Sequence, residues 1–166
     1  MANADRPVGF TVAEGQPYFA PKPYVTAASE TIAIGDMVSL DSAGRVTIAT
    51  SSTAIGLYLG VAASSVTSSS AGDEILVYDN PATIFQGQCS GDGALTDPYT
   101  TRSLAACFDI EGTTGIMEIN EDSTTYDVCK IIGIGTEPNG EESAVGTNQK
   151  KLFKIALGTH VYGVLA

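Results

Sequence analysis

Residues 37–50 read Met37-Val38-Ser39-Leu40-Asp41-Ser42-Ala43-Gly44-Arg45-Val46-Thr47-Ile48-Ala49-Thr50, and this stretch predicts a β-hairpin. Polar and apolar residues alternate on both sides of the turn at 41–44, which is the period of a half-buried strand. The inward face would carry four aliphatic side chains: Val38, Leu40, Val46 and Ile48. The hairpin favours an all-β fold.

Further short apolar segments, separated by turn signals, extend this pattern along the chain. They lie at 56–61, 73–78, 83–89, 108–110, 116–119, 128–134, 152–157 and 161–165. The run at 73–78 is apolar without interruption from Ile75 to Tyr78, which favours burial on both faces. The Ser- and Thr-rich residues 64–70 are expected to form a loop, and residues 100–107 to hold at most one short helix. The sequence therefore predicts a compact β-barrel or β-sandwich of about eight to ten short strands.

The first 26 residues differ from the rest because they hold four of the chain's seven prolines, with aromatic residues between them. Proline removes a backbone donor and fixes φ, so this segment predicts neither a regular helix nor a central strand. The aromatic residues favour ordered packing on a protein surface, its own or a neighbour's. We expect an extended arm, residues 1–26, followed by a single β-domain, residues 27–166. The arm residues expected to contact a partner are Pro7, Phe10, Pro17, Tyr18, Phe19, Pro21, Pro23 and Tyr24.

Charge and composition narrow the class of partner. Charged residues make up 16% of the 166 residues, below the roughly 25% of an average soluble domain, and a weakly polar surface suits permanent protein contacts. The net charge of −11 predicts no nucleic-acid partner and no binding to anionic lipid. No 18-residue apolar window or signal-peptide pattern occurs, so neither a membrane span nor export by a signal is expected.

Residue types that carry chemistry are scarce. Three cysteines, Cys89, Cys107 and Cys129, form no C-x-x-C pair and are expected to be free, buried thiols, with a disulfide between two of them as the alternative. His160 is the only histidine. We expect His160 to be packed in the core or at an interface, and we expect no enzymatic activity, no cofactor and no metal site. A small hydrolase using His160 is the alternative. The acidic segment 109–127 contains no Lys or Arg and is expected to be a solvated loop, with a calcium site as the alternative.

Several local patterns follow one another in a fixed order. After the opening residues 1–10 they are Ile34-Gly35-Asp36-Met37-Val38-Ser39-Leu40, Gly44-Arg45-Val46, Ala54-Ile55-Gly56, Gly60-Val61-Ala62, Gly72-Asp73-Glu74-Ile75-Leu76-Val77-Tyr78, Asn80-Pro81 and Ile84-Phe85-Gln86. Together they resemble the capsid cement or decoration proteins of tailed bacteriophages. The resemblance covers most of residues 30–90 and, more loosely, 145–163. In the two Gly-Asp turns, glycine would supply the positive φ and aspartate would accept backbone N–H bonds.

The resemblance implies a virion protein on the outer capsid surface, synthesised in the cytoplasm of a bacterial host. Its implied partners are the major capsid protein and further copies of itself, as a homotrimer or a homodimer. The arm would make a far-reaching contact, and edge strands would add to neighbouring sheets. The alternative is a tail- or fibre-associated module that binds a receptor or a glycan.

Overall fold

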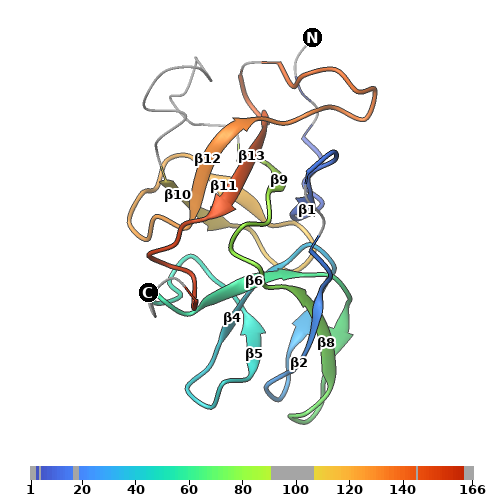
Figure 1. The fold of residues 1–166 in the computed structure, drawn as a ribbon, viewed down its shortest axis with the longest axis vertical. Coiled ribbons are helices and arrows are strands. Elements are labelled where there is room, and N and C mark those ends of the chain that lie inside the picture. The colour runs from blue at the N-terminus through green and yellow to red at the C-terminus, as the bar shows by residue number, and fades with distance from the viewer. Residues whose placement is uncertain (1–2, 4, 17–18, 91–106, 145, 163–166) are drawn as a thin grey trace.

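The computed structural model describes residues 3, 5–16, 19–90, 107–144 and 146–162. Within these residues the fold is all-β, with thirteen strands in three antiparallel sheets and no helix. The sheets do not close into a barrel, so the architecture is sandwich-like (Figure 1). The predicted fold class is thus confirmed, with more strands than expected because three of the thirteen contain only two residues.

A six-stranded sheet forms one half of the molecule, with strand order β1-β9-β13-β12-β10-β11 (Figure 1). Its strands are β1 (Thr11–Val12), β9 (Phe85–Gln88), β13 (Lys150–Ile155), β12 (Cys129–Ile134), β10 (Cys107–Glu111) and β11 (Glu118–Asn120). The sheet curls, so that Cys89, just after β9, forms an isolated bridge with Ile119 in the edge strand β11.

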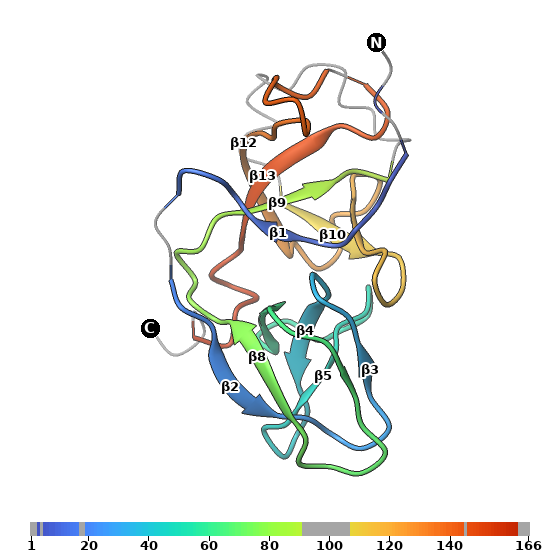
Figure 2. The ribbon, with the colours of Figure 1, turned by 90° about the vertical axis from the view of Figure 1, so that its right-hand side faces the viewer.

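The other half contains a five-stranded sheet of order β2-β8-β6-β4-β5 and a small two-stranded sheet (Figure 2). The strands are β2 (Lys22–Val25), β8 (Glu74–Tyr78), β6 (Tyr58–Ala62), β4 (Met37–Leu40) and β5 (Val46–Ile48), and then β3 (Thr31–Ile32) paired with β7 (Val66–Thr67). The presence of β7 corrects the expectation that residues 64–70 are only a loop. Its partner strand lies more than 30 residues earlier, beyond the reach of a local pattern.

The predicted hairpin is present as β4 and β5. Val38 pairs with Ile48 and Leu40 with Val46, while Asp41 Oδ1 accepts bonds from the backbone N–H of Ala43 and Arg45 at 2.8 and 2.9 Å. Val38 and Val46 are fully buried in the core of this half of the molecule. The side-chain alternation therefore predicted both the pairing and the inward face.

Two apolar clusters make up the core, one for each half. The larger one is built around the aromatic side chains Phe10, Phe85, Phe108 and Phe153. The glycines before the two predicted turn aspartates have φ of +90° and +110°, at Gly35 and Gly72. Asp36 accepts bonds from the N–H of Ala33 and of Gly115, both at 2.7 Å, and so ties the two halves together. The other turn uses a main-chain atom instead, since the carbonyl of Asp73 accepts the N–H of Thr26.

The proline-rich segment is extended, but it is integrated into both sheets. β1 pairs with β9, and β2 pairs with β8. Phe10, directly before β1, is 1% exposed, and its ring lies 5.0 Å from that of Phe153 in an edge-to-face contact. Pro23 lies in β2, an edge strand, where a missing N–H is tolerated. Residues before and after position 26 therefore share the same core.

Two further expectations concern segments that are only partly described. Residues 100–106, where a short helix was expected, lie outside the described residues, and Cys107 begins β10. Of the strand expected at 161–165, residues 161 and 162 lie in a turn and the rest are outside the described residues. In the part of the chain that is described, no helix has the length and apolar character required to span a bilayer.

Candidate interaction surfaces

The expected arm contacts are dispersed in the structure. Phe10 is in the core and presents no surface to a partner, whereas Pro7, Phe19, Pro21 and Tyr24 are half-buried. Pro23 is exposed. Two other residues of the expected set, Pro17 and Tyr18, lie outside the described residues.

Pro23 belongs to a small apolar surface on the outer side of β2 and β8, which we call the outer β2–β8 face: Pro23, Val25 and Leu76. The register places Pro23 opposite Leu76 and Val25 opposite Glu74, so these side chains share one face of the sheet. Val25 is 48% exposed and Leu76 is 37% exposed. On the inner face of β8, Ile75 and Val77 are fully buried. The prediction that β8 is buried on both faces is therefore wrong for the single chain.

Strand addition at the edges is restricted. In β5, the carbonyl of Val46 accepts the N–H of Ala27 at 2.9 Å, and the N–H of Ile48 donates to Glu30 Oε2 at 3.0 Å. In β2, Pro23 has no N–H to donate. Because these two edges of the five-stranded sheet are occupied or blunted, side-chain contact is better supported there than strand addition.

A polar cluster around Asp79 joins β2, the end of β8 and the last described residues. The Asp79 Oδ2 atom accepts bonds from Lys22 Nζ and Tyr24 Oη, both at 2.7 Å, and from Tyr162 Oη at 3.2 Å. The tyrosine hydroxyls are 2.8 Å apart. Burial opposes ionisation of Asp79, but the bonds from Lys22 and Tyr24 outweigh it and hold the pKa of this carboxyl below its usual value. The cluster thus fastens the N-terminal segment to the C-terminal one.

His160 lies beside this cluster and is fully buried, as the sequence led us to expect. Its Nδ1 accepts the N–H of Tyr162 at 3.1 Å, and burial lowers the pKa of the imidazole. The pKa of Tyr24 is raised, chiefly by burial, so its phenol stays protonated. These groups bond to one another and to the backbone, and such an arrangement stabilises the fold.

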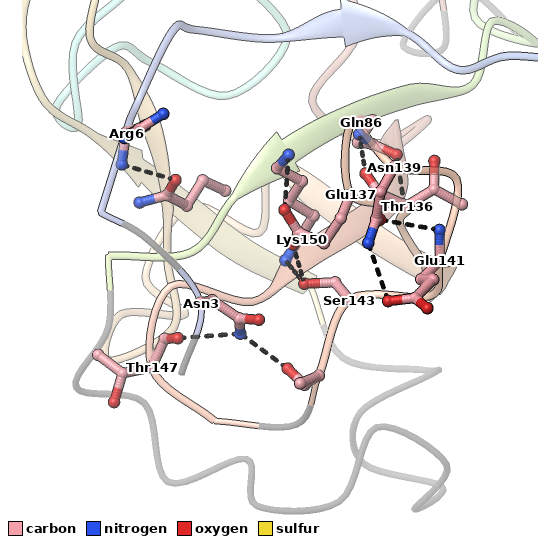
Figure 3. A network of polar contacts seen from close by, with 12 residues as sticks. Asn3, Arg6, Gln86, Thr136, Glu137, Asn139, Glu141, Ser143, Thr147 and Lys150 are labelled. Atoms are coloured by element: carbon pink, nitrogen blue, oxygen red, sulfur yellow. Dashed lines mark hydrogen bonds and ion pairs between the residues drawn. The ribbon is translucent and has the colours of Figure 1, made fainter. Parts of the chain in front are cut away.

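A second polar network lies around the turn between β12 and β13 (Figure 3). Glu137 accepts a bond from Ser143 Oγ at 2.7 Å and pairs with Lys150 at 3.1 Å; these contacts lower the pKa of Glu137, the Ser143 bond most. Gln86 of β9 bonds the N–H and the carbonyl of Thr136. A groove of about 360 Å³ lies between this turn and β1. The polar side chains that line this groove are largely bonded to one another. The network therefore fixes the turn 136–143 against the sheet.

The acidic segment 109–127 is only partly solvated, which corrects the expectation of a solvated loop. Asp109 is 2% exposed and accepts backbone N–H bonds from Thr125, Tyr126 and Asp127, as well as the hydroxyl of Ser123. It therefore organises the loop before β12 in the way an N-terminal capping aspartate organises a helix. Among the described residues, no three His, Cys, Asp or Glu side chains are grouped to hold a metal ion.

A buried charge pair inside the larger half was missed by the sequence analysis. Lys151 Nζ lies 3.8 Å from Glu121 Oε1, and the two side chains are 1% and 6% exposed. Burial raises the pKa of Glu121, with Cys89 and Lys151 opposing this effect. In β13 Lys151 shares the buried face with Phe153 and Ile155, but a lysine in a sequence is ordinarily assigned to the solvent side because of its charge. All three cysteines are free, as expected; Cys89 and Cys129 are also buried as expected, whereas Cys107 is half-buried.

No protein-family model matches the chain, and no curated protein matches it at a significant level.

Proposed function

We propose that this chain is a non-enzymatic structural protein of a phage virion, which binds the outer capsid surface and holds neighbouring major capsid protein subunits together. The observation that carries the proposal is the outer β2–β8 face. A strand whose sequence is apolar without interruption is typical of burial on both sides, yet in the single chain Ile75 and Val77 are buried whereas Leu76 is 37% exposed. A protein partner would cover Val25 and Leu76 on the other side.

Each contact of this kind contributes only a small part of the free energy of binding to the capsid. Full burial of an aliphatic side chain contributes about 1.5–3 kcal/mol, and part of the surface of Leu76 is already covered. A capsid presents the same site many times, and an oligomer bound at several sites gains further through effective concentration. A small apolar face on each copy is therefore sufficient for stable decoration of a shell.

Composition and sequence order support the same proposal. Charged residues are 16% of the chain, which suits a protein with permanent contacts, and the order of the Gly-Asp turns and short strands resembles that of capsid cement proteins. The partners in this proposal are the major capsid protein and further copies of the chain.

The test is cosedimentation of the purified protein with phage heads that lack it. The double variant Val25→Lys/Leu76→Thr should lose most of its occupancy, since it removes apolar area from the outer β2–β8 face. The new lysine lies opposite Glu74, which favours the folded sheet, and circular dichroism would verify folding. A matched control is Ile55→Lys, because Ile55 is 59% exposed but lies elsewhere; it should bind like the wild type.

Full occupancy by the double variant would refute the contact surface. If the wild type failed to bind heads and instead bound host cells or their glycans, the receptor-binding alternative would replace the proposal. Copy number separates the same two functions, because cement proteins occur at ratios near that of the major capsid protein and tail modules in a few copies per particle.

A further inference from the structure

Two like-charge pairs of opposite sign lie in the six-stranded sheet. Lys130 in β12 is directly opposite Lys154 in β13, and Glu111 in β10 is directly opposite Glu118 in β11. Like charges in directly opposed positions destabilise a sheet, because their side chains share one face at short distance. None of the four side chains forms an ion pair with another described residue. Direct ion pairing within the described part of the chain therefore leaves the charges of both pairs uncompensated.

The lysine pair borders an apolar hollow of about 370 Å³, which we call the basic hollow: Pro81, Ala82, Lys130, Lys154, Ile155, Ala156 and Leu157. Leu157 is 63% exposed at its rim. On a chain with 8 basic and 19 acidic residues, two adjacent lysines around an apolar recess are unusual. The hollow suits a partner that offers an aliphatic side chain flanked by carboxylates.

The glutamate pair has this composition. Ile116, in the turn between β10 and β11, is 48% exposed, and it lies close in sequence to Glu118. Gln88 Nε2 donates to both Glu118 Oε1 and Asp5 Oδ1, at 3.1 and 3.2 Å, so these two carboxylates lie close together, and the register places Glu111 opposite Glu118. We call Ile116 with Asp5, Glu111 and Glu118 the acidic knob.

The two surfaces lie on different sides of the molecule. Figure 2 shows the β10–β11 hairpin on one side and the segment after β13 on the other. One copy thus cannot satisfy its own knob with its own hollow, whereas two copies can do so head to tail. Contacts of this kind generate rings where the rotation closes, and chains where it does not.

We propose that copies of this chain associate head to tail, with the acidic knob of one copy seated at the basic hollow of the next. The contact would neutralise both like-charge pairs and cover Ile116 and Leu157. It deepens the proposed cement function and rests on that function for its biological role. Because self-association is measured in the absence of capsids, its failure is distinguishable from failure of head binding.

Charge reversal tests the contact by sedimentation velocity at low ionic strength and about pH 8, where Glu118, whose pKa is raised to about 7, is ionised. The wild type should self-associate. An acidic variant, Lys130→Glu/Lys154→Glu, and a basic variant, Glu111→Lys/Glu118→Lys, should each weaken association at least about tenfold, which corresponds to about 1.4 kcal/mol. An equimolar mixture of the two should associate again, because the knob of each then faces the oppositely charged hollow of the other.

The four-residue swap in a single chain should also restore association, because it exchanges the signs of both surfaces. Reversal of two exposed acids elsewhere, Glu14→Lys/Glu74→Lys, is the control for net charge and should leave association within about twofold of the wild type. A wild type that stays monomeric at all concentrations would overturn the proposal. So would a mixture and a swapped chain that both stay as weakly associated as the separate reversal variants.

Discussion

Glu118 allows the electrostatics of the structure to be tested directly through the variant Glu118→Gln. Burial, together with the nearby carboxylates of Asp5 and Glu111, raises the pKa of Glu118 from 4.5 to about 7. The folded protein therefore binds this proton more tightly than the unfolded chain does. Below about pH 4.5 both states are protonated and the residue contributes nothing to the pH dependence. Between about pH 4.5 and 7 the unfolded state ionises first, so stability falls as the pH rises.

At about 1.36 kcal/mol for each pH unit, the interval from 4.5 to about 7 sets an upper limit of about 3.4 kcal/mol. Glu118 is half-buried, and solvent screens part of its interaction with Asp5 and Glu111, so we expect about 1–2 kcal/mol. The neutral glutamine keeps a carbonyl that accepts the bond from Gln88 and removes the penalty. Glu118→Gln should thus match the wild type in acid and exceed its stability by this amount at about pH 8.

Urea denaturation followed by circular dichroism measures the free energy of unfolding across this pH range. The protein is kept at a concentration where sedimentation shows a monomer, so that self-association does not contribute. The matched control is Glu74→Gln, since Glu74 is exposed on β8. If Glu118→Gln gave the same change in stability at both ends of the range, or if the control behaved alike, the assignment of the raised pKa would be refuted.

Three further perturbations test the packing. Phe10→Ala should lower the free energy of unfolding by about 3–5 kcal/mol in urea, because it empties a core position beside Phe153; a change near zero would mean that the N-terminal segment is not part of the core. Gly60→Ala should strongly reduce the yield of folded protein, since its Cβ would lie 2.2 Å from the Tyr78 carbonyl oxygen, whereas Gly158→Ala, with open space around it, should express and melt normally. Asp79→Asn should lower the free energy of unfolding by about 1–3 kcal/mol at neutral pH. This difference should shrink as the pH falls below about 4, because Asp79, whose pKa is lowered in the folded protein, stabilises the fold only while its carboxyl is ionised. A difference that stayed constant into acid would contradict the role of the charge.

Local patterns predicted the fold where pairing is local. The β4–β5 hairpin follows from a two-residue period around one turn, and the Gly35-Asp36 turn follows from the conformational freedom of glycine. Strand β7 was missed because its pairing with β3 spans more than 30 residues and contains only two residues on each side. Proline spacing correctly predicted an extended N-terminal segment, but it carries no information about where Phe10 packs.

The candidate surfaces could not be predicted from the sequence, because they depend on the register of the sheets. The glutamates at 111 and 118 appear in the sequence as two ordinary acids, and only the pairing of β10 with β11 places them side by side. The burial of Lys151 and Glu121 likewise depends on strands that are not neighbours in the sequence. For β8, the apolar sequence predicted that both faces are buried, but in the single chain Leu76 on the outer β2–β8 face is 37% exposed.

The integration of the first strands into both sheets has a consequence for synthesis. β1 is synthesised well before its partner β9, which begins at Phe85, and β9 also pairs with β13, which begins at Lys150. The isolated bridge between Tyr58 and His160 likewise forms only after His160 has been synthesised. Most tertiary contacts are of this long-range kind, which predicts slow folding with a large loop-closure cost. The nascent chain thus keeps Phe10 and its apolar neighbours uncovered until β13 has been synthesised, so a product truncated before β13 would expose them and be a substrate for chaperones and proteases.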